Sequence, residues 1–534
     1  MGLLSLDRPE FYFLALSIVN IMNFIDRGII PGATEEFTSF IDNTIGTSTP
    51  SLYIGMLQSS FIIGVCFASP VFATLAHKNN VFTLVGYGMS TWIVAAVISG
   101  MAFYARSYEV LIVGRILSGV GEAAFVCCTS PWIAINANPE TKSTWLAIFA
   151  TAMPLGTALG YVYSSVIATS IGWKWAFFIE AAYMVPFVVL LFVMARKFPM
   201  VQPGHRHFPA PPQSAASTPL LGRHASHDEA SPEHGRPPSR STSFVGEAVE
   251  RRMSIEAALD PPSVWEETLK VLRYPCFIHI TLGYAALTAV LIGLATFGSA
   301  FFLALDFFDT EVAASSAFGI LVSIAGMIGF PLGGKLIDIY SRRRKNTNVL
   351  SREADLIASS GIMALFGTIG MLLFIVTYFS RERLFGMGTI FVATVALFVC
   401  NAATNVGLIY SIPIENRPFG IAFNCIWMHL LGDVPSPLVA GYLKDRLASG
   451  CVGDDDGVST SDACRDDAGG IRLTMLLISL WLVWCTVFFG LSYRHALSLD
   501  RDYAQEAGLR EGHKDSKVMS LRNEHSVDAG LTSA

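Results

Sequence analysis

The sequence predicts an all-α membrane protein in which twelve transmembrane helices form two pseudo-symmetric six-helix bundles. Three observations support this prediction. Hydrophobic residues make up 52% of the chain and charged residues only 15%, whereas an average soluble domain has about 25% charged residues. Apolar windows recur along the chain, and each is long enough to cross about 30 Å of hydrocarbon. A polar stretch divides these windows into two equal sets.

The spans follow one another closely within each set. The first apolar run contains Asp26 and Arg27, so it predicts a transmembrane helix of the mature protein rather than a cleavable signal peptide. The first six spans are expected near 10–31, 51–76, 81–104, 108–132, 143–169 and 175–196. The second six are expected near 275–304, 312–340, 355–379, 384–411, 418–446 and 471–494.

The stretch between the two sets is rich in Pro, Ser, Arg and His and has no apolar periodicity, which predicts a disordered linker. Just after it, Trp265, Leu269 and Leu272 repeat with helical spacing, as in a helix that lies on a membrane surface. The expected organisation is an N-terminal bundle (1–196), a cytosolic linker (197–262), an amphipathic surface helix (263–273), a C-terminal bundle (274–495) and a disordered cytosolic tail (496–534).

Basic residues fall in alternate loops, together with both termini, and the largest basic run is 342–345. The positive-inside rule places these loops and the termini in the cytosol. The opposite loops are acidic, and one of them carries Cys451 and Cys464. Because that side permits disulfides, we expect these two cysteines to be bridged, the alternative being two free thiols.

Two opposite charges, Arg115 and Glu122, stand in the middle of the fourth span. Ionisable groups at bilayer depth usually face the bundle interior or a water-filled cavity. A spacing of seven residues returns to nearly the same helix face, but it separates the two side chains by about 10 Å along the axis. Each residue therefore needs a partner from another helix.

Depth along antiparallel helices indicates which partner. Asp26 in the first span lies at the level of Arg115, while Glu122 lies deeper and has no obvious cation. A carboxylate without a partner in hydrocarbon tends to bind a proton. The hypothesis is that Glu122 or Asp26 is the proton-coupling group, while Arg27 and Arg115 hold an anionic head group with their planar guanidinium groups. The alternative is that these charges only lock the helices together.

Weaker candidates lie in other spans. His429 and Asp433 are four residues apart on one helix face, so they form either a second proton relay or a packing hydrogen bond. Glu180 stands in the sixth span without an obvious partner. Several asparagines either line the substrate cavity or make interhelical hydrogen bonds, namely Asn20, Asn23, Asn401 and Asn405.

The two halves also share local sequence. One repeated stretch runs from Pro331 through Gly334 and Asp338 to the basic turn at Arg342. A similar but less well preserved stretch begins at Pro70. A second repeat matches Pro154 and Gly160-Tyr161 with Pro435 and Gly441-Tyr442 at the same spacing. Repeated six-helix halves with a binding site at their interface are typical of secondary transporters.

Particular motifs make the resemblance to a known family specific. The stretch with Gly334, Asp338 and Arg342 resembles the gating loop motif of the major facilitator superfamily. More narrowly, residues 23–28, 114–123 and 429–437 resemble the spinster branch. This resemblance implies transport of a sphingolipid or lysophospholipid by alternating access, often with protons, and it assigns Asp26, Arg27, Arg115 and Glu122 to the charged cavity. Ala73 and His77 depart from the superfamily pattern, so any charge latch should depend mostly on Asp338.

We therefore expect a secondary active, proton-coupled lipid carrier rather than an enzyme, with no cofactor, no metal site and no catalytic residues. The expected partners are an amphipathic lipid substrate and the lipid bilayer, with no nucleic acid, and the expected state is a monomer in an endomembrane or the plasma membrane. Two alternatives remain. A major facilitator carrier for a small organic anion or sugar fits the same fold. An intramembrane lipid-processing enzyme fits less well, because the chain has no nucleophile elbow, phosphate-binding loop or metal-ligand motif.

Overall fold

The described part of the chain is almost entirely helical. The computed structural model describes residues 9–76, 79–137, 142–197, 264–345, 351–380, 382–413, 416–451 and 467–501. The first half contains α1 (Pro9–Gly32), α2 (Thr34–Ile45), α3 (Pro50–Ala76), α4 (Val81–Ala105), α5 (Tyr108–Asn136), α6 (Lys142–Ile171) and α7 (Lys174–Lys197). The second half contains α9 (Val264–Leu272), α10 (Pro275–Ala304), α11 (Glu311–Lys345), α12 (Ser351–Phe379), α13 (Arg383–Ser411), α14 (Arg417–Met428), the π-helix η2 (His429–Asp433), α15 (Pro435–Leu447), the short η3 (Ser449–Cys451) and α17 (Ala468–Ser479), after which helix resumes over 481–501.

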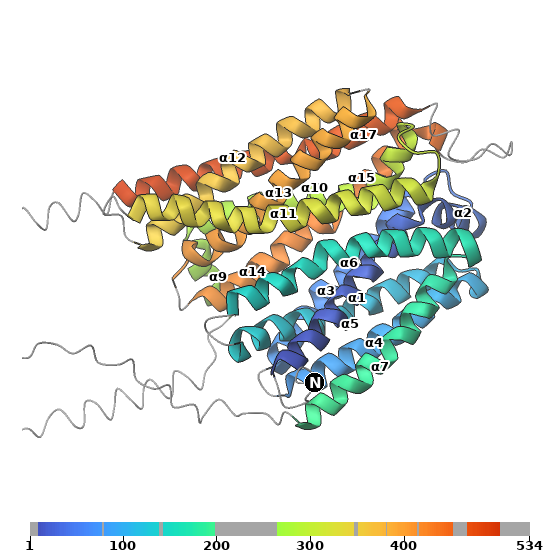
Figure 1. The fold of residues 1–534 in the computed structure, drawn as a ribbon, viewed down its shortest axis with the longest axis horizontal. Helices are drawn as coiled ribbons and strands as arrows, with labels where there is room; N and C mark the ends of the chain where they lie inside the picture. Colours follow the sequence, from blue (N-terminus) through green and yellow to red (C-terminus); the bar gives the residue numbers. More distant parts are fainter. Residues whose placement is uncertain are drawn as a thin grey trace, which may run out of the picture. The chain divides into compact units, whose positions relative to one another are not determined.

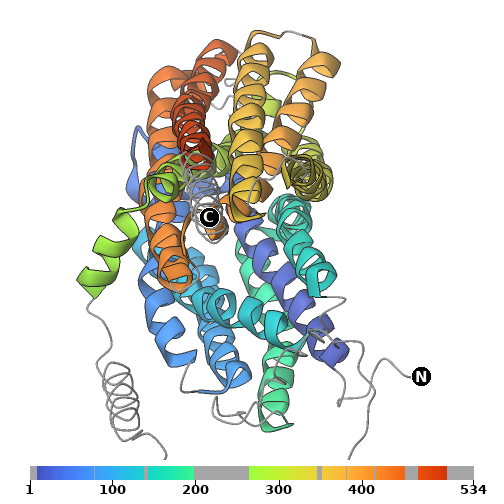
Figure 2. The same cartoon turned by 90° about the vertical axis from the view of Figure 1, so that its left-hand side faces the viewer.

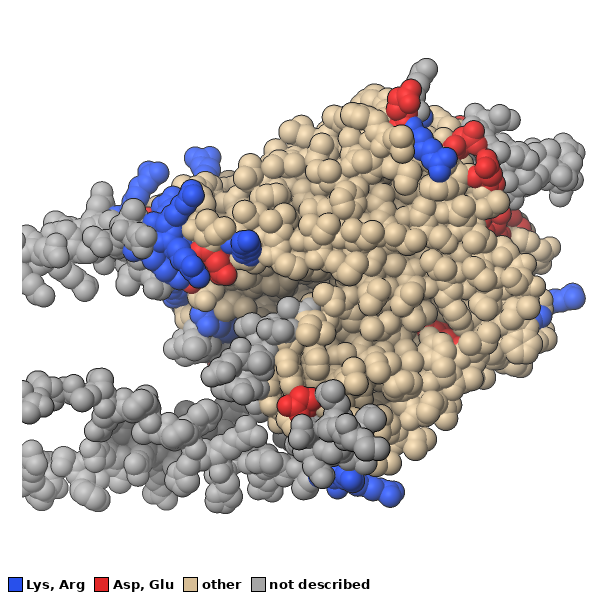
Figure 3. All heavy atoms as spheres, in the orientation of Figure 1, with Lys and Arg blue, Asp and Glu red and all other residues tan. Residues whose placement is uncertain are grey.

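Ten of the described helices are long and apolar enough to cross a membrane. The two other predicted spans are α6, which is 30 residues long, and the interrupted helix from α14 to α15. In the space-filling view, basic side chains gather at the end of the molecule where α11 ends, and a broad band with few charged side chains follows (Figure 3). The prediction of an all-α, multi-pass integral membrane protein is confirmed.

The membrane helices form two groups that follow the two halves of the sequence (Figures 1 and 2). In the first group, α1 packs on α6, α5 packs between α3 and α4, and α4 also packs on α7. In the second group, α13 packs on both α11 and α12, and α10 contacts most of its neighbours. The predicted division into two bundles matches this arrangement.

Two helix pairs join the bundles, α3 with α15 and α6 with α11. Small residues let their backbones approach closely, since a Cβ on Gly55 would lie 2.2 Å from the carbonyl oxygen of Pro437. A Cβ on Gly441 would lie 2.1 Å from the carbonyl oxygen of Ser51. The two sequence repeats fall in these same four helices, which explains why small residues and prolines recur there.

The predicted span 418–446 is interrupted rather than continuous. Proline at position 435 cannot donate to the carbonyl four residues earlier, and its ring would clash with that carbonyl in a regular α-helix. The helix accommodates the proline with the five-residue π-helix η2, which separates α14 from α15. His429 and Asp433 stand at the two ends of this π-helix.

Several polar contacts between the bundles lie at the end of the molecule where α2 lies. Asp445 in α15 accepts hydrogen bonds from the amides of Ser51 (3.1 Å) and Leu52 (2.8 Å) in the first turn of α3. Lys444 Nζ donates to Ser51 Oγ at 3.0 Å. Glu311 at the start of α11 accepts from the amide of Glu35 at 3.0 Å. These contacts close the bundles together at the end that the sequence places away from the cytosol.

Some predictions from the sequence agree with the structure only in part. The helix α2 lies between the first two spans and was not expected as a separate helix. A helix does occupy Val264–Leu272, while its placement on a membrane surface stays a prediction. The last helix continues to residue 501 rather than ending at 495. The predicted disorder of the linker and of the tail concerns residues that lie almost wholly outside the described ones.

Candidate functional site

A buried ion pair joins α1 to α5. Arg115 Nη1 lies 2.8 Å from Asp26 Oδ1 and 3.0 Å from Oδ2, and neither side chain is more than 1% exposed. The depth argument from the sequence predicted this partner, and the structure confirms the pairing. The guanidinium of Arg115 also lies over the ring of Phe61, with 4.8 Å to the ring centroid.

A second ion pair joins the same two helices. Arg27 Nη2 lies 2.5 Å from Glu122 Oε1, and Arg27 Nε lies 3.5 Å from Oε2. The prediction that Glu122 has no cationic partner is therefore wrong. Glu122 is 1% exposed, whereas Arg27 keeps 27% of its side chain exposed.

The reason for this error is the direction of side chains on helices. Side chains lean toward the N-terminus of their own helix. Because α1 and α5 run antiparallel, Arg27 leans along α1 toward the level of Glu122, and Glu122 leans along α5 toward Arg27. A comparison of backbone depths alone does not account for this convergence. The long side chain of Arg27 covers the remaining distance to Glu122.

Glu180 in α7 joins the same cluster, although the sequence offered no partner for it. Its side chain is fully buried and interacts with both Asp26 and Arg115. The hydroxyl of Tyr183, one helical turn later, donates to Glu180 Oε1 at 3.4 Å. An acidic residue within an apolar span was the available signal, but its partners lie on α1 and α5, far away in the sequence.

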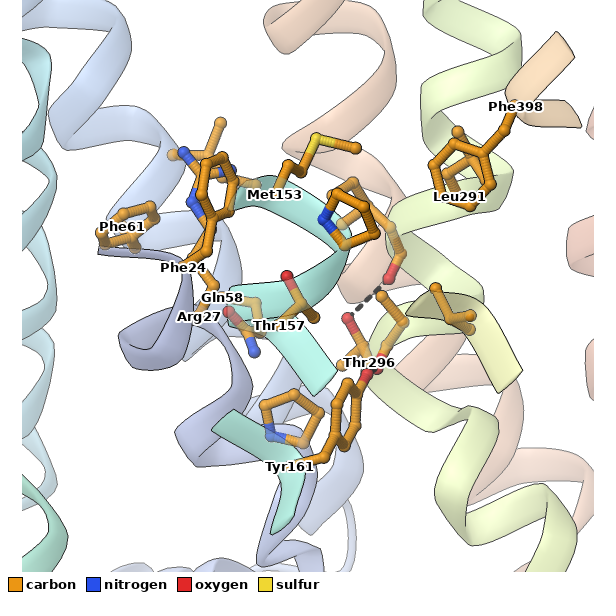
Figure 4. Close-up of a pocket in the computed structure, with 16 residues that line it drawn as sticks. Phe24, Arg27, Gln58, Phe61, Met153, Thr157, Tyr161, Leu291, Thr296 and Phe398 are labelled. Atoms are coloured by element: carbon orange, nitrogen blue, oxygen red, sulfur yellow. Dashed lines mark hydrogen bonds between the residues drawn. The ribbon is translucent and has the colours of Figure 1, made fainter. Parts of the chain in front are cut away.

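A cavity lies beside this cluster, between the two bundles (Figure 4). Arg27, Phe24 and Phe61 face it from one side, and Leu291 and Phe398 face it from the other. The remaining lining comes from Pro31, Gln58, Ile62, Met153, Pro154, Thr157, Tyr161, Ile292, Ala295, Thr296 and Val322. The lining is thus mainly apolar, and Arg27 is the one charged residue in it.

Arg115 is not part of this lining. Its side chain has no exposed surface, and Asp26 and Phe61 hold its guanidinium group. In the conformation described here, Arg27 is therefore the arginine that can touch a molecule in the cavity. The predicted contact of Arg115 with a head group stays a prediction.

The asparagine candidates lie at other places. Asn20 is buried and donates to the carbonyl oxygen of Phe149 at 3.0 Å, so it makes an interhelical hydrogen bond. Asn23 is buried, and neither polar atom of its amide has a partner among the described residues. Asn405 is exposed and donates to the carbonyl oxygen of Asn401 at 3.1 Å. None of these residues lines the cavity around Arg27.

His429 and Asp433 form a pair, as their spacing predicted. His429 Nδ1 lies 2.7 Å from Asp433 Oδ2, and Asp433 Oδ1 has no partner among the described residues. Since Arg27 also attracts Asp433, this pair belongs to the electrostatic surroundings of the cavity. Its role as a proton relay stays a prediction.

The predicted cytosolic gating motif is exposed. A Cβ on Gly334 would meet no atom within 4 Å. Asp338 and Arg342 are exposed and form no ion pair within the described part of the chain. The neighbouring Lys345 instead lies 3.0 Å from Asp355 on α12.

Two further predictions concern metals and cysteines. No group of histidine, cysteine and acidic side chains among the described residues is placed to hold a metal ion. The predicted bridge between Cys451 and Cys464 lies outside the described residues, because Cys464 does.

Comparisons with known proteins agree with this architecture. The family model of the Major Facilitator Superfamily matches residues 16–412. The protein named "Probable sphingolipid transporter spinster homolog 1" of Arabidopsis thaliana is 28% identical over 455 residues, covering 82% of this chain and 83% of that protein. "Protein spinster homolog 1" of Homo sapiens is 27% identical over 466 residues, covering 83% and 74%.

Solved structures show the same fold. The crystal structure of a bacterial homolog to the human lysosomal transporter Spinster, in an inward-facing and occupied conformation, aligns with a TM-score of 0.64 and 16% identity over 91% of this chain and 96% of that one. A nucleoside transporter aligns with a TM-score of 0.54 and 13% identity, so the fold alone does not choose a cargo.

The family match runs through both bundles, and the spinster resemblance inferred from three motifs is confirmed by the curated relatives. Family membership also decides between a transporter and the intramembrane enzyme considered from the sequence. The chain belongs to the Major Facilitator Superfamily and is a multi-pass membrane transporter.

Proposed function

We propose that this chain is a secondary active carrier for an anionic, single-chain lipid, either a sphingolipid or a lysophospholipid, and that it works by alternating access. The observation that supports this proposal is the cavity between the bundles, which is mainly apolar and has one cation, Arg27, at one side. Such a cargo has a charged head and an apolar tail, and this lining has the same division. The names of the curated relatives support the lipid class.

Arg27 suits an anionic head group for two reasons. Its planar guanidinium can offer two parallel hydrogen bonds to phosphate or carboxylate oxygens. The rings of Phe24 and Phe61 lie 5.0 and 5.2 Å from it, which holds the guanidinium at the cavity wall. The partial exposure of Arg27 leaves part of its surface free for a ligand.

The proposed coupling ion is the proton, and no bound cofactor takes part. The ion pair with Glu122 competes with cargo for Arg27. A proton on Glu122 removes its negative charge and weakens that pair, so Arg27 becomes available to an anionic head group. Proton and cargo would then bind together rather than exclude each other.

The two-bundle architecture supports alternating access. Several of the described polar contacts between the bundles, such as those of Asp445 with α3, lie at the α2 end. Opening this end requires breaking them, while the ion pairs of Arg27 and Arg115 stay within one bundle. We expect a monomer to suffice, since one chain supplies both halves of the cavity.

Uptake into proteoliposomes tests the proposal. Labelled lysophospholipids, sphingoid bases, sphingosine phosphate and sugars are offered with and without a pH gradient. We expect lipid uptake that a gradient stimulates and that Arg27→Ala abolishes, while Arg196→Gln, an exposed arginine in the last turn of α7, serves as the matched control. Saturable uptake of a sugar or small organic anion, with none for lipids, would support the alternative cargo instead.

A further inference from the structure

Five ionisable side chains share one buried cluster in the N-terminal bundle. Three are acids and two are bases, so the cluster would carry one net negative charge if every group were ionised. An uncompensated charge at bilayer depth costs several kcal/mol. The members are Asp26, Arg27, Arg115, Glu122 and Glu180.

The two ion pairs leave Glu180 as the acid without a cation of its own. Arg115 Nη1 makes both of its short contacts with Asp26, and Arg27 is paired with Glu122. Among the described residues, Glu180 Oε1 accepts a hydrogen bond from the hydroxyl of Tyr183 alone. Its other oxygen, Oε2, is buried and accepts no hydrogen bond from any described residue.

The helices around Glu180 offer little compensation. On α1, Asp26 is the titratable group that faces Glu180, on α5 it is Arg115, on α6 it is Tyr163, and on its own helix it is Tyr183. The helix α4 packs along α7 but contains no acidic or basic residue in Val81–Ala105. The immediate surroundings thus place two carboxyl groups beside one arginine.

The carboxyl group of Asp26 interacts with that of Glu180, both through its charge and as a hydrogen-bonding partner. Two ionised carboxylates are acceptors only and cannot bond to each other, whereas a protonated carboxyl has an O–H that donates. One proton on Glu180 therefore makes a bond to Asp26 possible and brings the cluster to zero net charge.

We propose that Glu180 is a proton-binding residue of this transporter and that, in this conformation, it holds a proton which it donates to Asp26. The site is the carboxyl pair formed by α7 and α1, separate from Glu122, and its ligand is a single proton. The assignment of that proton to a transport cycle rests on the proposed function, while the protonation itself does not.

Loss of this proton would change the pairing of Arg115. Two of its nitrogens, Nε and Nη2, are buried and have no hydrogen-bond partner among the described residues. An ionised Glu180 would attract Arg115, which could then donate these free N–H groups to it. Arg115 would be shared between α1 and α7 instead of being bound to Asp26 alone, so release of the proton would shift the contacts of α1.

Infrared difference spectroscopy of the purified full chain in lipid nanodiscs tests the protonation without any transport. At neutral pH, we expect the difference between the unaltered chain and Glu180→Gln to contain the stretching band of a protonated carboxylic acid, and we expect Glu180→Asp to retain that band. Glu109→Gln, which removes an exposed carboxyl at the start of α5, is the matched control and should leave the band unchanged. A difference spectrum between the unaltered chain and Glu180→Gln that lacks this band would overturn the proposal.

Uptake measurements then test the role in the cycle. Glutamine is neutral and close in shape, so Glu180→Gln should fold and still bind cargo, but it should lose the stimulation of uptake by a pH gradient. Loss of the band with unchanged stimulation would overturn the coupling role and leave a static neutral residue. If the unaltered chain moved no lipid, the proposed cargo would fail while the spectroscopic result remained readable.

Discussion

Removal of the Asp445 carboxylate should open the end of the transporter at which the bundles now meet. The two oxygens of Asp445 accept from the amides of Ser51 and Leu52, at 3.1 and 2.8 Å, in the first turn of α3. Those amides have no partner within their own helix. A carboxylate of one bundle therefore caps a helix of the other.

The size of the effect follows from this geometry. Replacing an N-terminal capping side chain by alanine costs about 0.5–2 kcal/mol, and the negative charge at the positive end of the helix dipole adds about 0.3–1 kcal/mol. Water can replace part of these bonds in an open state. We therefore take about 2 kcal/mol as the amount by which Asp445→Ala destabilises the closed state relative to the open state. That loss shifts the ratio of closed to open molecules by a factor of about 30.

Thiol labelling measures this shift. A cysteine introduced at Gln58, which lines the cavity, should react faster with a membrane-impermeant reagent applied from the α2 side when Asp445 is replaced by alanine. Asp467→Asn is the matched control, because Asp467 accepts from the amide of Gly450 within the C-terminal bundle. Equal labelling rates with and without Asp445 would refute the reasoning.

Three further predictions follow from other parts of the chain. Gly28→Ala places a Cβ 2.7 Å from the backbone of α6 and should destabilise the protein by about 1–3 kcal/mol in thermal unfolding, whereas Gly334→Ala meets no atom within 4 Å and should be neutral. Burial, and after it repulsion from Asp445, raises the pKa of Asp42. Ionised Asp42 therefore destabilises the folded protein, and this destabilisation is absent at low pH and grows as pH rises. Asp42→Asn should raise the melting temperature at pH 7 and should not do so at pH 3. Reduction should shift the mass of a peptide that spans Cys451 and Cys464, and complete alkylation of both without reductant would contradict the bridge.

The sequence was sufficient for the large-scale fold because hydrocarbon imposes strict rules on backbone and charge. Long apolar runs had to be helices, and the division into two halves followed from the polar linker. The pairing of Asp26 with Arg115 was also predictable, since antiparallel helices bring residues at equal depth to the same level. The family expectation came from motifs, and the match over residues 16–412 supports it.

The features that the sequence did not reveal depend on side-chain direction and on local backbone choice. Glu122 pairs with Arg27 because two side chains lean toward each other across a difference in backbone depth. The π-helix at 429–433 forms where the helix accommodates Pro435. A hydropathy window cannot distinguish a π-helix from a regular α-helix. The neighbours of Glu180 lie on α1 and α5, so no local pattern indicated them.

In the proposed cycle, Arg27 is the member of the charged cluster that links it directly to the cargo cavity, on the geometry of the described residues. The bonds that hold the bundles together, such as those of Asp445, involve no member of the charged cluster. Both ion pairs of the cluster join α1 to α5 inside one bundle, so protonation alone cannot separate the bundles. Of the five clustered residues, only Arg27 also lines the cavity that the two bundles share. A change in charge at Glu122 or Glu180 can therefore reach the second bundle by changing what Arg27 binds in that cavity, namely the cargo or the Asp433 carboxylate that already attracts it.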